Sequence, residues 1–521
     1  MLTTSAFTRS ISDSFLRFWQ HNPALLYGIM AIWGVLLPLS PELWPYCLLF
    51  LALAALPLWS NRDFFHSPLT IRFGLGILLA ISLFFLTQQT YLVPDALAAP
   101  VRGVAVVKID SAATTTSPFG KRRLYKGVAT TFAGPDGVIA RNLPITLSLP
   151  YSASTPPIDR TYQIEGRLRR SPQGRFSISP DQTIAWKPLK PLWSLAEERS
   201  LAKSFVKQTI EKQISSPHTA AFLSGIAAGE FDDTQLSFEL GRFGLQHLMA
   251  ISGLHFSILA AMLATLFSFF FPKKGVAAAT LIALSLYFLF LGHSPSVLRA
   301  WIAIALLMGA VFIKRRSQAL NSLGIALLAI AILDPLAIRF IPFQFSFGVT
   351  ASILLWYGPC DHFLQHLFQK RTLSAVAAMH WVDQHGYCLL HFLRQGLALA
   401  IAVNLIALPL TLFYFHRFPS MSFVYNLFFP FLVSVSMFLL LLGLPLQWLL
   451  PPLGKALFWL NEHYTTFLLN LVFNLPKSFD HTWHAAPFDG SFILIYAIVL
   501  FAAGIAVRGS SIPLAQNFLT T

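Results

Sequence analysis

The chain has 521 residues, of which 55% are hydrophobic and only 11% are charged. Soluble globular domains carry about 25% charged residues, so this composition excludes a soluble protein and indicates one that crosses a membrane many times. The formal net charge of +15 has two explanations, which are basic loops on the cytoplasmic side of a membrane and a polyanionic partner. The three cysteines are isolated and match no zinc or disulfide spacing.

Three apolar runs open the chain, and each is close to the roughly 20 residues that cross a hydrocarbon core. They cover residues 23–40, 43–59 and 72–93. The first residues contain no short apolar region followed by a small-residue cleavage site. We therefore expect no removable signal peptide, and we predict an N-terminal tail with three transmembrane helices over residues 1–94.

Residues 95–193 differ abruptly, because short alternating apolar runs are separated by Gly, Pro, Asp and Ser. Period-2 alternation with turn residues predicts a small β domain of about five strands, either a sandwich or a barrel. Residues 194–245 are expected to form an amphipathic helical linker.

Hydrophobic runs return after residue 246, and they predict about eleven transmembrane helices in the whole chain. The runs cover residues 247–271, 275–292, 296–313, 318–333, 343–359, 395–414, 421–449 and 491–507. Residues 455–476 are polar enough to be interfacial or re-entrant. The predicted fold class is thus a polytopic α-helical membrane protein with an inserted small β domain. We divide the rest of the chain into two segments, residues 246–450 and residues 451–521.

Basic residues in the short loops predict the orientation. With the N-terminal tail in the cytoplasm, the basic pairs at 62/72 and 273/274 fall on the cytoplasmic side, as do residues 314–316 and 370/371. The β domain then lies on the outer side. Its 14 Lys and Arg against six acidic residues give a net charge of +8, which the positive-inside rule does not explain.

Two partners fit a basic external domain, namely anionic lipid headgroups and the phosphate backbone that basic OB-type barrels bind along one face. Aromatic residues are available either for base stacking or for a core, and they are Phe119, Tyr125, Tyr151, Tyr162 and Phe176. The candidate DNA-binding residues are Lys121, Arg122, Arg123, Lys126, Arg167, Arg169, Arg170 and Arg175.

Polar residues interrupt the predicted helix that starts near residue 247. His247, Ser252 and His255 span an arc of about 140° on an ideal helix, with Gly253 between them. Helix packing, a pore lining and a catalytic Ser-His pair are all open. This helix has no carboxylate to orient the imidazole and the chain has no GxSxG sequence, so a pore or packing role is favoured over hydrolysis.

Further polar residues recur inside later apolar runs. Ser294 and Pro295 predict a helix start, and Asp334-Pro335 predicts a turn. Polar groups at membrane depth are tolerated where a neighbour or a water-filled cavity satisfies them, so their recurrence predicts a lumen. The candidate lining residues are His247, Ser252, Gly253, His255, Arg299, Gln344, Ser346, Asn404 and Asn426.

Four segments, taken in order, resemble the competence domain of the ComEC family. They are HLMAISGLHFSIL (247–259), LGHSPSVLRAWIA (291–303), LDPLAIRFIPFQFSF (333–347) and LIALPLTLFYFHRFPSMSFVYNLFFPFLV (405–433). The resemblance covers about residues 23–450. It implies a multi-pass protein of the bacterial inner membrane with an external OB-like domain, which passes single-stranded DNA into the cytoplasm during natural transformation. It also implies DNA-receptor and helicase or ATPase partners, contact with membrane lipids, and a possible homo-oligomer.

The chain departs from many family members in two respects. It has no HxHxDH sequence of a metallo-β-lactamase-like domain, and residues 95–193 contain no cysteine. His481, His484 and Asp489 match no familiar metal spacing, and no GxxxxGK[ST] sequence is present. We therefore expect a non-enzymatic channel without metal or cofactor, driven by a partner ATPase or the membrane potential.

Two other functions stay open. An intramembrane hydrolase would use Ser252 and His255, and it would need an acidic partner such as Asp334 or Glu239. An exporter of a lipid-linked substrate would also have many spans, but it would not require a basic external domain.

Overall fold

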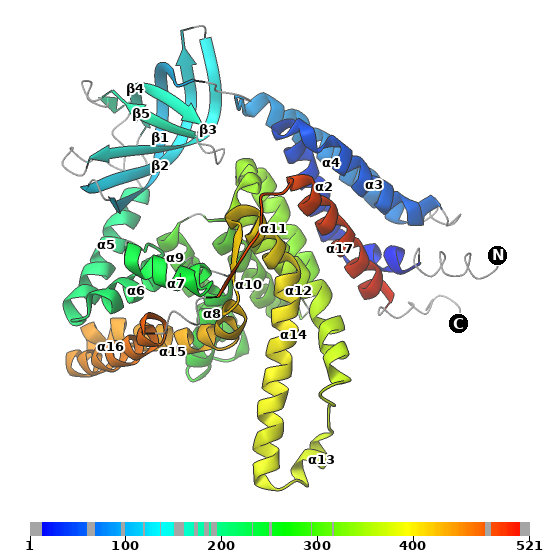
Figure 1. Cartoon of the computed structure of the whole chain (residues 1–521), viewed down its shortest axis with the longest axis vertical. Coiled ribbons are helices and arrows are strands. Elements are labelled where there is room, and N and C mark those ends of the chain that lie inside the picture. Colours follow the sequence, from blue (N-terminus) through cyan, green and yellow to red (C-terminus); the bar gives the residue numbers. More distant parts are fainter. Residues whose placement is uncertain are drawn as a thin grey trace. The chain divides into compact units, whose positions relative to one another are not determined.

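The computed structural model (Figure 1) describes residues 13–59, 68–94, 99–117, 120–135, 137–150, 161–170, 176–181, 187–188, 195–231, 233–249, 253–292, 294–314, 317–474 and 481–510. The chain forms two compact units, each built from separate stretches of sequence. The first unit comprises Met1–Leu83, Ile302–Pro430 and Pro476–Thr521. The second comprises Phe84–Trp301 and Phe431–Leu475. Among the described helices, three contribute residues to both units, namely α4 (Pro68–Thr90), α10 (Pro295–Ile313) and α15 (Ser422–Leu449).

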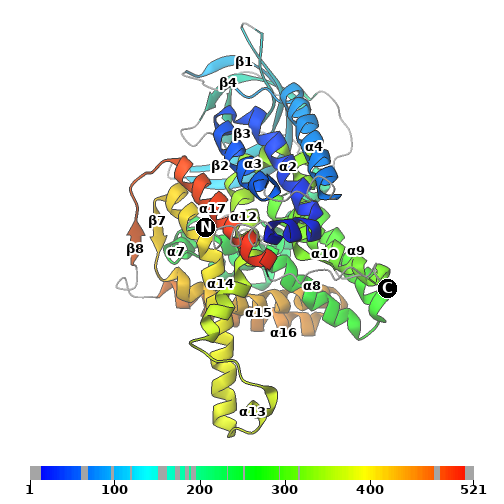
Figure 2. The ribbon, with the colours of Figure 1, turned by 90° about the vertical axis from the view of Figure 1, so that its right-hand side faces the viewer.

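The described part of the first unit consists of helices and one short sheet. Its helices are α2 (Pro23–Leu39), α3 (Trp44–Trp59), α4 (Pro68–Thr90, as far as Leu83), α11 (Ala319–Leu333), α12 (Ile341–Gln365), α13 (Leu373–Ala377), α14 (Trp381–Phe415) and α17 (Gly490–Ser510). Helix α14 packs along α12 and α17 (Figure 2). Beyond the end of α14, β7 (Arg417–Pro419) pairs antiparallel with β8 (Thr482–His484), which precedes α17.

Small residues let α2 approach two neighbouring helices closely. A β-carbon on Gly28 would lie 2.6 Å from the carbonyl oxygen of Gly324 in α11. A β-carbon on Gly34 would overlap the backbone of Ala80 in α4. Membrane helices gain dispersion energy when small residues allow such backbone contact. The glycines of α2 therefore allow it to pack closely against both α11 and α4.

The second unit contains a closed β barrel. Its strands are β1 (Val101–Ser117), β2 (Gly120–Gly134), β3 (Gly137–Pro150), β4 (Thr161–Arg170), β5 (Phe176–Pro180) and the short β6 (Lys187–Pro188). The order is β1-β2-β3-β5-β4, and β4 pairs back onto β1 to close the barrel. The β3–β5 pair is parallel, and the other strand pairs in the described part of this sheet are antiparallel. The sequence-based prediction of about five strands is confirmed, and the barrel alternative is the correct one.

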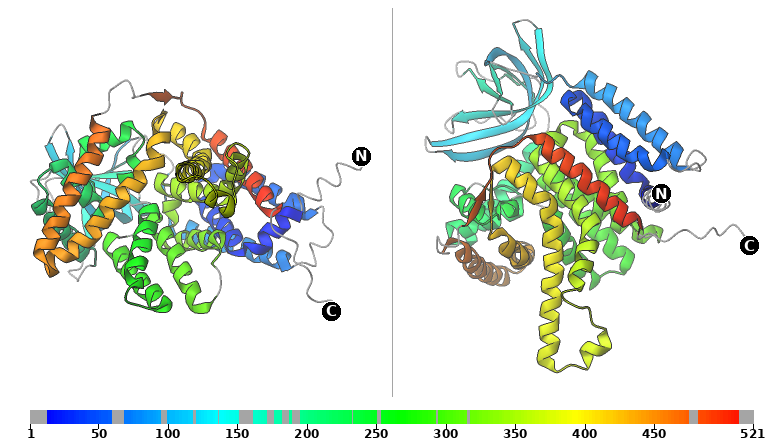
Figure 3. Two further views of the ribbon diagram at one scale, coloured as in Figure 1. Left: turned by 90° about the horizontal axis from the view of Figure 1, so that it is seen from below. Right: turned by 45° about the vertical axis from the view of Figure 1, so that its right-hand side comes forward.

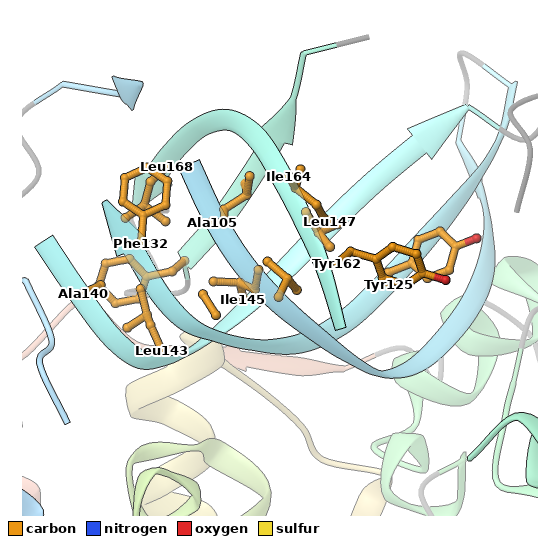
Figure 4. Packing of buried hydrophobic residues seen from close by; sticks show 14 of the residues in the cluster. Ala105, Tyr125, Phe132, Ala140, Leu143, Ile145, Leu147, Tyr162, Ile164 and Leu168 are labelled. Carbon is orange, nitrogen blue, oxygen red and sulfur yellow. The ribbon is translucent and has the colours of Figure 1, made fainter. Parts of the chain in front are cut away.

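Alternate residues of the barrel strands fill its interior (Figure 4). On β1, Ala105, Val107 and Ile109 are each 0% exposed. A bulge between Val106 and Val107 shifts the pairing with β2, and bulges of this kind bend long strands around a barrel. The core cluster consists of barrel residues, with Val93 packed against it, so the domain has its own hydrophobic core.

The rest of the second unit is helical. It comprises α5 (Leu195–Gln213), α6 (Pro217–Ala228), α7 (Thr234–Arg242), the 3-10 helix η3 (Gln246–Met249), α8 (Gly253–Ser268), α9 (Lys273–Leu291), the first residues of α10 (Pro295–Ile313), the later part of α15 (Ser422–Leu449), and α16 (Pro451–Phe473). Helices α5, α6 and α7 occupy the segment that the sequence predicts as helical. A buried hydrogen-bond network joins α15 to α16, because the Ser436 hydroxyl lies 2.8 Å from that of Thr465 and the Asn461 amide donates to the Ser436 carbonyl at 3.1 Å.

Each predicted apolar run forms a helix, but fewer helices meet the requirements of a membrane span. Among the described residues, six are long and apolar enough, namely α4, α9, α10, α14, α15 and α17. The bent pair Asp13–His21 and Pro23–Leu39 would make a seventh. Helices α8 and α11 are apolar but shorter, and α16 is not among the six. The predicted count of about eleven spans is not confirmed.

Candidate functional site

Two arginines face each other across neighbouring strands on the outside of the barrel. Residue Arg102 of β1 pairs in register with Arg167 of β4, and both side chains are exposed. Directly opposed like charges destabilise a sheet. Asp181 offsets part of this repulsion, because its carboxylate lies 2.9 Å from the Arg102 guanidinium. The opposed pair places two cations within reach of one anionic ligand.

More basic side chains surround this pair on the barrel surface. Arg169 follows Arg167 at a spacing of two, so both point outward from β4. Arg170 lies over the ring of Phe176, 5.7 Å from its centroid, which is a cation–π contact. The other exposed basic residues of the described strands are Lys108, Lys126 and Arg141. Among the predicted DNA-binding residues, Lys126, Arg167, Arg169 and Arg170 are thus exposed on the barrel.

The remaining predicted DNA-binding residues are less completely described. Lys121, Arg122 and Arg123 lie in β2 opposite Thr116, Thr115 and Thr114 of β1, but the positions of their side chains are outside the described structure, and so is Arg175 as a whole. Arg102 and Lys108 were missing from the predicted set. Their alternation with the apolar residues of β1 would have placed them on the outer face.

Three of the aromatic residues considered for base stacking are buried inside the barrel. Tyr125, Tyr162 and Phe176 are 1%, 3% and 8% exposed and pack in the core. Figure 4 shows the rings of Tyr125 and Tyr162 among the aliphatic side chains. Of the two alternatives for these three residues, the core is thus the correct one, because closure of the barrel turns their side of the strands inward. Phe119 and Tyr151 lie outside the described residues.

The polar segment that begins at His247 is not one continuous α-helix. His247 belongs to η3, is exposed, and has its Nδ1 atom 3.2 Å from the Gly244 carbonyl oxygen. The described part of α8 starts at Gly253, and residues 250–252 lie outside the described structure. Because His247 lies in a 3-10 helix, the arc expected for a single ideal α-helix does not apply to His247 and His255 together. Ser252 lies outside the described residues, so its relation to His255 stays a prediction.

Gly253 and Arg299 come together inside the second unit. Helix α10 begins at Pro295 as predicted, and the Ser294 hydroxyl accepts from the Val297 N–H at 3.4 Å. This start aims Arg299 at α8, where a β-carbon on Gly253 would overlap its guanidinium. His255, two residues further along α8, is 3% exposed. The structure thus brings Gly253 and Arg299 together and buries His255 nearby in the chain.

The candidate lining residues of the first unit form a separate set. The Gln344 carboxamide oxygen in α12 accepts from the Tyr414 hydroxyl in α14 at 2.5 Å. Asn404 donates to the Ala400 carbonyl of its own helix at 2.9 Å. Ser346 is half-buried, and Asn426 is exposed on α15. Sequence reasoning missed Tyr414, because tyrosines are also common at membrane interfaces.

The predicted lining residues are thus divided between the two units. His247, Gly253, His255 and Arg299 belong to the second, and Gln344, Ser346, Asn404 and Asn426 belong to the first. A single lumen that contains all of them stays a prediction.

A pocket of about 450 Å³ lies between α5 and α6, and its wall includes Glu230 and Asp233. Both acids already have partners, since Lys203 lies 2.8 Å from Glu230 and His218 lies 2.6 Å from Asp233. Within the described residues, no group of three or more His, Cys, Asp or Glu side chains is arranged to hold a metal ion. The acidic residues of this pocket are therefore explained by their ion pairs, which connect the segments around α5, α6 and α7.

The histidines near the C-terminal end are also structural. His484 lies in β8 opposite Arg417 of β7. The Asp489 carboxylate accepts from the Ser491 N–H at 2.7 Å at the start of α17. This hydrogen bond lowers the pKa of Asp489 because it stabilises the charged form.

These features define a helical membrane protein with a basic β-barrel domain. The chain belongs to the competence protein family, whose family model, described as "Competence protein", matches residues 231–509. It is also similar to ComE operon protein 3 of Bacillus subtilis (strain 168), with 22% identity over 213 residues. That match covers 40% of this chain and only 27% of the Bacillus protein. No solved structure matches the chain.

Proposed function

We propose that this protein is the channel through which single-stranded DNA enters the cytoplasm during natural transformation, in the inner membrane of a bacterium. Its family membership supports a role in DNA uptake. The observation that carries the proposal is the exposed Arg102–Arg167 pair on the barrel. Opposed cations cost stability in the free protein, and a phosphate backbone between them relieves that cost.

The barrel is proposed to be of the OB type and to bind the strand first. Its strand order β1-β2-β3-β5-β4-β1, with a parallel β3–β5 pair, is that of a small Greek-key barrel. Since Tyr125 and Tyr162 are buried, binding rests on phosphate contacts from Arg102, Arg167 and Arg169. Such binding is independent of sequence and sensitive to salt.

The polar groups within the helices are proposed to line the path. Arg299 attracts phosphate in surroundings of low dielectric constant, where a charge acts more strongly than in water. Gly253 provides room for its guanidinium. The amides and hydroxyls of the first unit, including Gln344 and Tyr414, keep the path hydrated. No covalent step is required of any of these residues, so the proposed protein is a channel and no enzyme.

The proposed channel works with partners. The chain contains no GxxxxGK[ST] sequence, so we expect a helicase or ATPase, or the membrane potential, to supply the energy. A DNA receptor on the outer side delivers the strand, lipids surround the spans, and a second copy of the chain is a further possible partner.

DNA uptake tests the proposal. Arg102→Ala/Arg167→Ala, expressed in a transformable bacterium that lacks its own homologous protein, should lower the cytoplasmic uptake of labelled DNA per molecule of membrane protein. The matched control is Lys273→Ala/Lys274→Ala, which removes two exposed cations at the start of α9. Unchanged uptake in the barrel variant, at normal abundance, would remove the observation that carries the proposal.

A further inference from the structure

A helical hairpin links α12 to α14 in the first unit. We use the term hairpin for residues 362–393, which include α13. An ion pair holds its base, because the Arg394 guanidinium lies 3.1 Å from the Asp361 carboxylate while the Arg394 side chain is only 3% exposed. Arg394 also donates to the Phe368 carbonyl at 3.2 Å. The two helices are therefore fixed to each other at the level of this pair.

This ion pair marks the edge of the membrane. Residues 395–415 of α14 contain no charged side chain, and at about 1.5 Å per residue they span about 31 Å. This length of α14 matches the roughly 30 Å hydrocarbon core. Residues 341–360 of α12, which packs along α14, are likewise uncharged, although α12 is not among the six helices that meet the requirements of a span. The hairpin therefore begins where the hydrocarbon ends.

The far end of the hairpin lies beyond the lipid headgroups. From Arg394 back to Trp381, α14 continues as helix for about 20 Å, whereas the headgroup layer adds only roughly 5–8 Å on each side. Figures 1 and 2 and the right-hand view of Figure 3 show α13 and the start of α14 extending past α11 and α17. Trp381 stands at this far end and is 65% exposed on the protein surface.

Two imidazoles flank this exposed tryptophan, and two cations lie in the facing segment of the hairpin. The rings of His380 and His385 each lie 5.9 Å from the Trp381 ring. Lys370 and Arg371 are exposed at the other side of the hairpin. The Arg371 N–H donates to the Tyr387 hydroxyl of α14 at 3.0 Å, which holds that connection against the helix. Asp383 is the one acidic residue between positions 362 and 393.

We propose that the tip of this hairpin, residues 370–387, is a second binding surface for single-stranded nucleic acid. The inference rests on the proposed function, because the tip would receive the strand after the membrane. An exposed aromatic ring stacks on any base, and neighbouring cations neutralise the backbone. A protein-binding surface centres on clustered apolar residues with few charges. Among the described side chains of the tip, only Trp381 and Val382 are large, apolar and exposed, and they share the tip with two exposed cations and two imidazoles that flank Trp381.

The chain provides a matched control for Trp381. In α16, Trp459 is 62% exposed, and His463 has its Nδ1 atom 2.8 Å from the Trp459 carbonyl oxygen. In α14, His385 makes the same contact with Trp381 at 2.7 Å. Trp459→Ala thus removes a similarly exposed ring whose carbonyl has the same contact with a histidine four residues further on. Lys273→Ala/Lys274→Ala serves as the charge control for Lys370→Ala/Arg371→Ala.

Photo-crosslinking of the full chain in lipid nanodiscs tests the proposal, because nanodiscs expose both faces of the membrane. The probe is an oligothymidylate that carries 5-bromodeoxyuridine, and crosslinked peptides are mapped by mass spectrometry. We expect crosslinks at the hairpin tip as well as on the barrel. Trp381→Ala should lower the tip crosslinks about tenfold, in line with the loss of one stacked base, and Trp381→Phe should retain them. Lys370→Ala/Arg371→Ala should lower the same crosslinks, and the two controls should not.

The possible failures are distinguishable. Barrel crosslinks without tip crosslinks in the unchanged chain would overturn this inference and leave the proposed function standing. Tip crosslinks that survive both hairpin variants would also overturn it. Absence of crosslinks at both places would count against the proposed function itself. If Trp381→Ala lowers uptake in cells but leaves the crosslinks unchanged, the tip binds a protein partner, and the nucleic-acid inference is wrong.

Discussion

The Tyr496 hydroxyl of α17 donates a 2.7 Å hydrogen bond to the Leu405 carbonyl in the middle of α14. Leu405 lies four residues before Pro409, and proline has no N–H to satisfy that carbonyl within the helix. In a membrane, an unsatisfied carbonyl is costly because no water is available to replace the donor. Tyr496 therefore compensates for the proline from a neighbouring helix.

Removal of the Tyr496 hydroxyl should destabilise the first unit. We expect Tyr496→Phe, which keeps the ring, to cost about 1–3 kcal/mol, since it leaves a buried acceptor without a donor. Thermal unfolding in detergent measures the loss. Tyr464→Phe is the matched control, because the Tyr464 hydroxyl donates at 2.8 Å to Leu432, whose carbonyl is in α15 and retains its helical N–H donor.

The same explanation predicts a suppressor. Pro409→Ala restores the missing N–H to α14, so the added loss from Tyr496→Phe should shrink in the Pro409→Ala background. A double-mutant cycle measures this coupling. Strictly additive losses would show that Tyr496 contributes by some route other than the Leu405 carbonyl.

Substitution of Gly253 should disturb Arg299. Gly253→Ala places a methyl group where the guanidinium lies, so we expect less DNA uptake per molecule in the membrane. The control is Gly309→Ala in α10, where a β-carbon meets nothing within 4 Å. It should leave uptake and thermal stability unchanged or slightly improved, since alanine favours helix. Equal effects of the two variants would contradict a specific contact at Gly253.

The barrel fragment 91–193 should bind single-stranded DNA in a salt-dependent manner. Arg102→Ala/Arg167→Ala should weaken binding and reduce the slope of log affinity against log salt by about 0.7 for each lost phosphate contact. Asp181→Asn should do the opposite, because it removes the anion that lies 2.9 Å from Arg102. The same variant should lower the melting temperature of the free fragment, since the repulsion between Arg102 and Arg167 increases. If none of these substitutions alters the slope of log affinity against log salt, the result would favour binding of the barrel to anionic lipid headgroups.

Ser252 distinguishes a conduit from a hydrolase. A hydroxyl that only hydrates a path is worth little by itself, so Ser252→Ala should reduce uptake modestly, and His255→Leu should reduce it more because it adds apolar bulk at a buried position. A nucleophile would behave differently. Complete loss in Ser252→Ala at normal abundance, with labelling of Ser252 by a serine-reactive phosphonate, would contradict the conduit.

The orientation is testable with reporter fusions. We expect fusions within residues 95–193 to report the outer side and fusions at residues 370–371 to report the cytoplasm, because basic loops stay inside. A cytoplasmic signal from the barrel would reverse the direction of transport and move the hairpin to the other side of the membrane.

The sequence by itself predicted the features that depend on near neighbours. Period-2 alternation gave the strands around Ala105 and Val107, apolar runs gave the helices, and Ser294-Pro295 gave the start of α10. These signals are local, since a strand repeats every two residues and a helix every 3.6. The resemblance of four short segments was sufficient to identify the family, which the match over residues 231–509 confirms.

Local patterns did not decide whether a strand residue fills a core or faces a ligand, or how the residues around His247 are divided between helices. The sequence around Tyr125 and Tyr162 fits both base stacking and core packing. Only the closure of β4 onto β1 turns the two side chains inward. The apolar residues after His247 resembled one helix, yet His247 lies in a 3-10 helix and the described part of α8 begins at Gly253.

The tertiary structure alone decided the pairings between distant residues. Arg102 meets Arg167 through strand register, and Tyr496 reaches a carbonyl 91 residues away in the sequence. The sequence shows that Pro409 leaves one helical carbonyl without its N–H donor, but no neighbouring residue indicates which side chain replaces that donor. The physical reason is that burial and hydrogen bonding are satisfied in space, so the partner of a polar group is set by which helices and strands come to lie together.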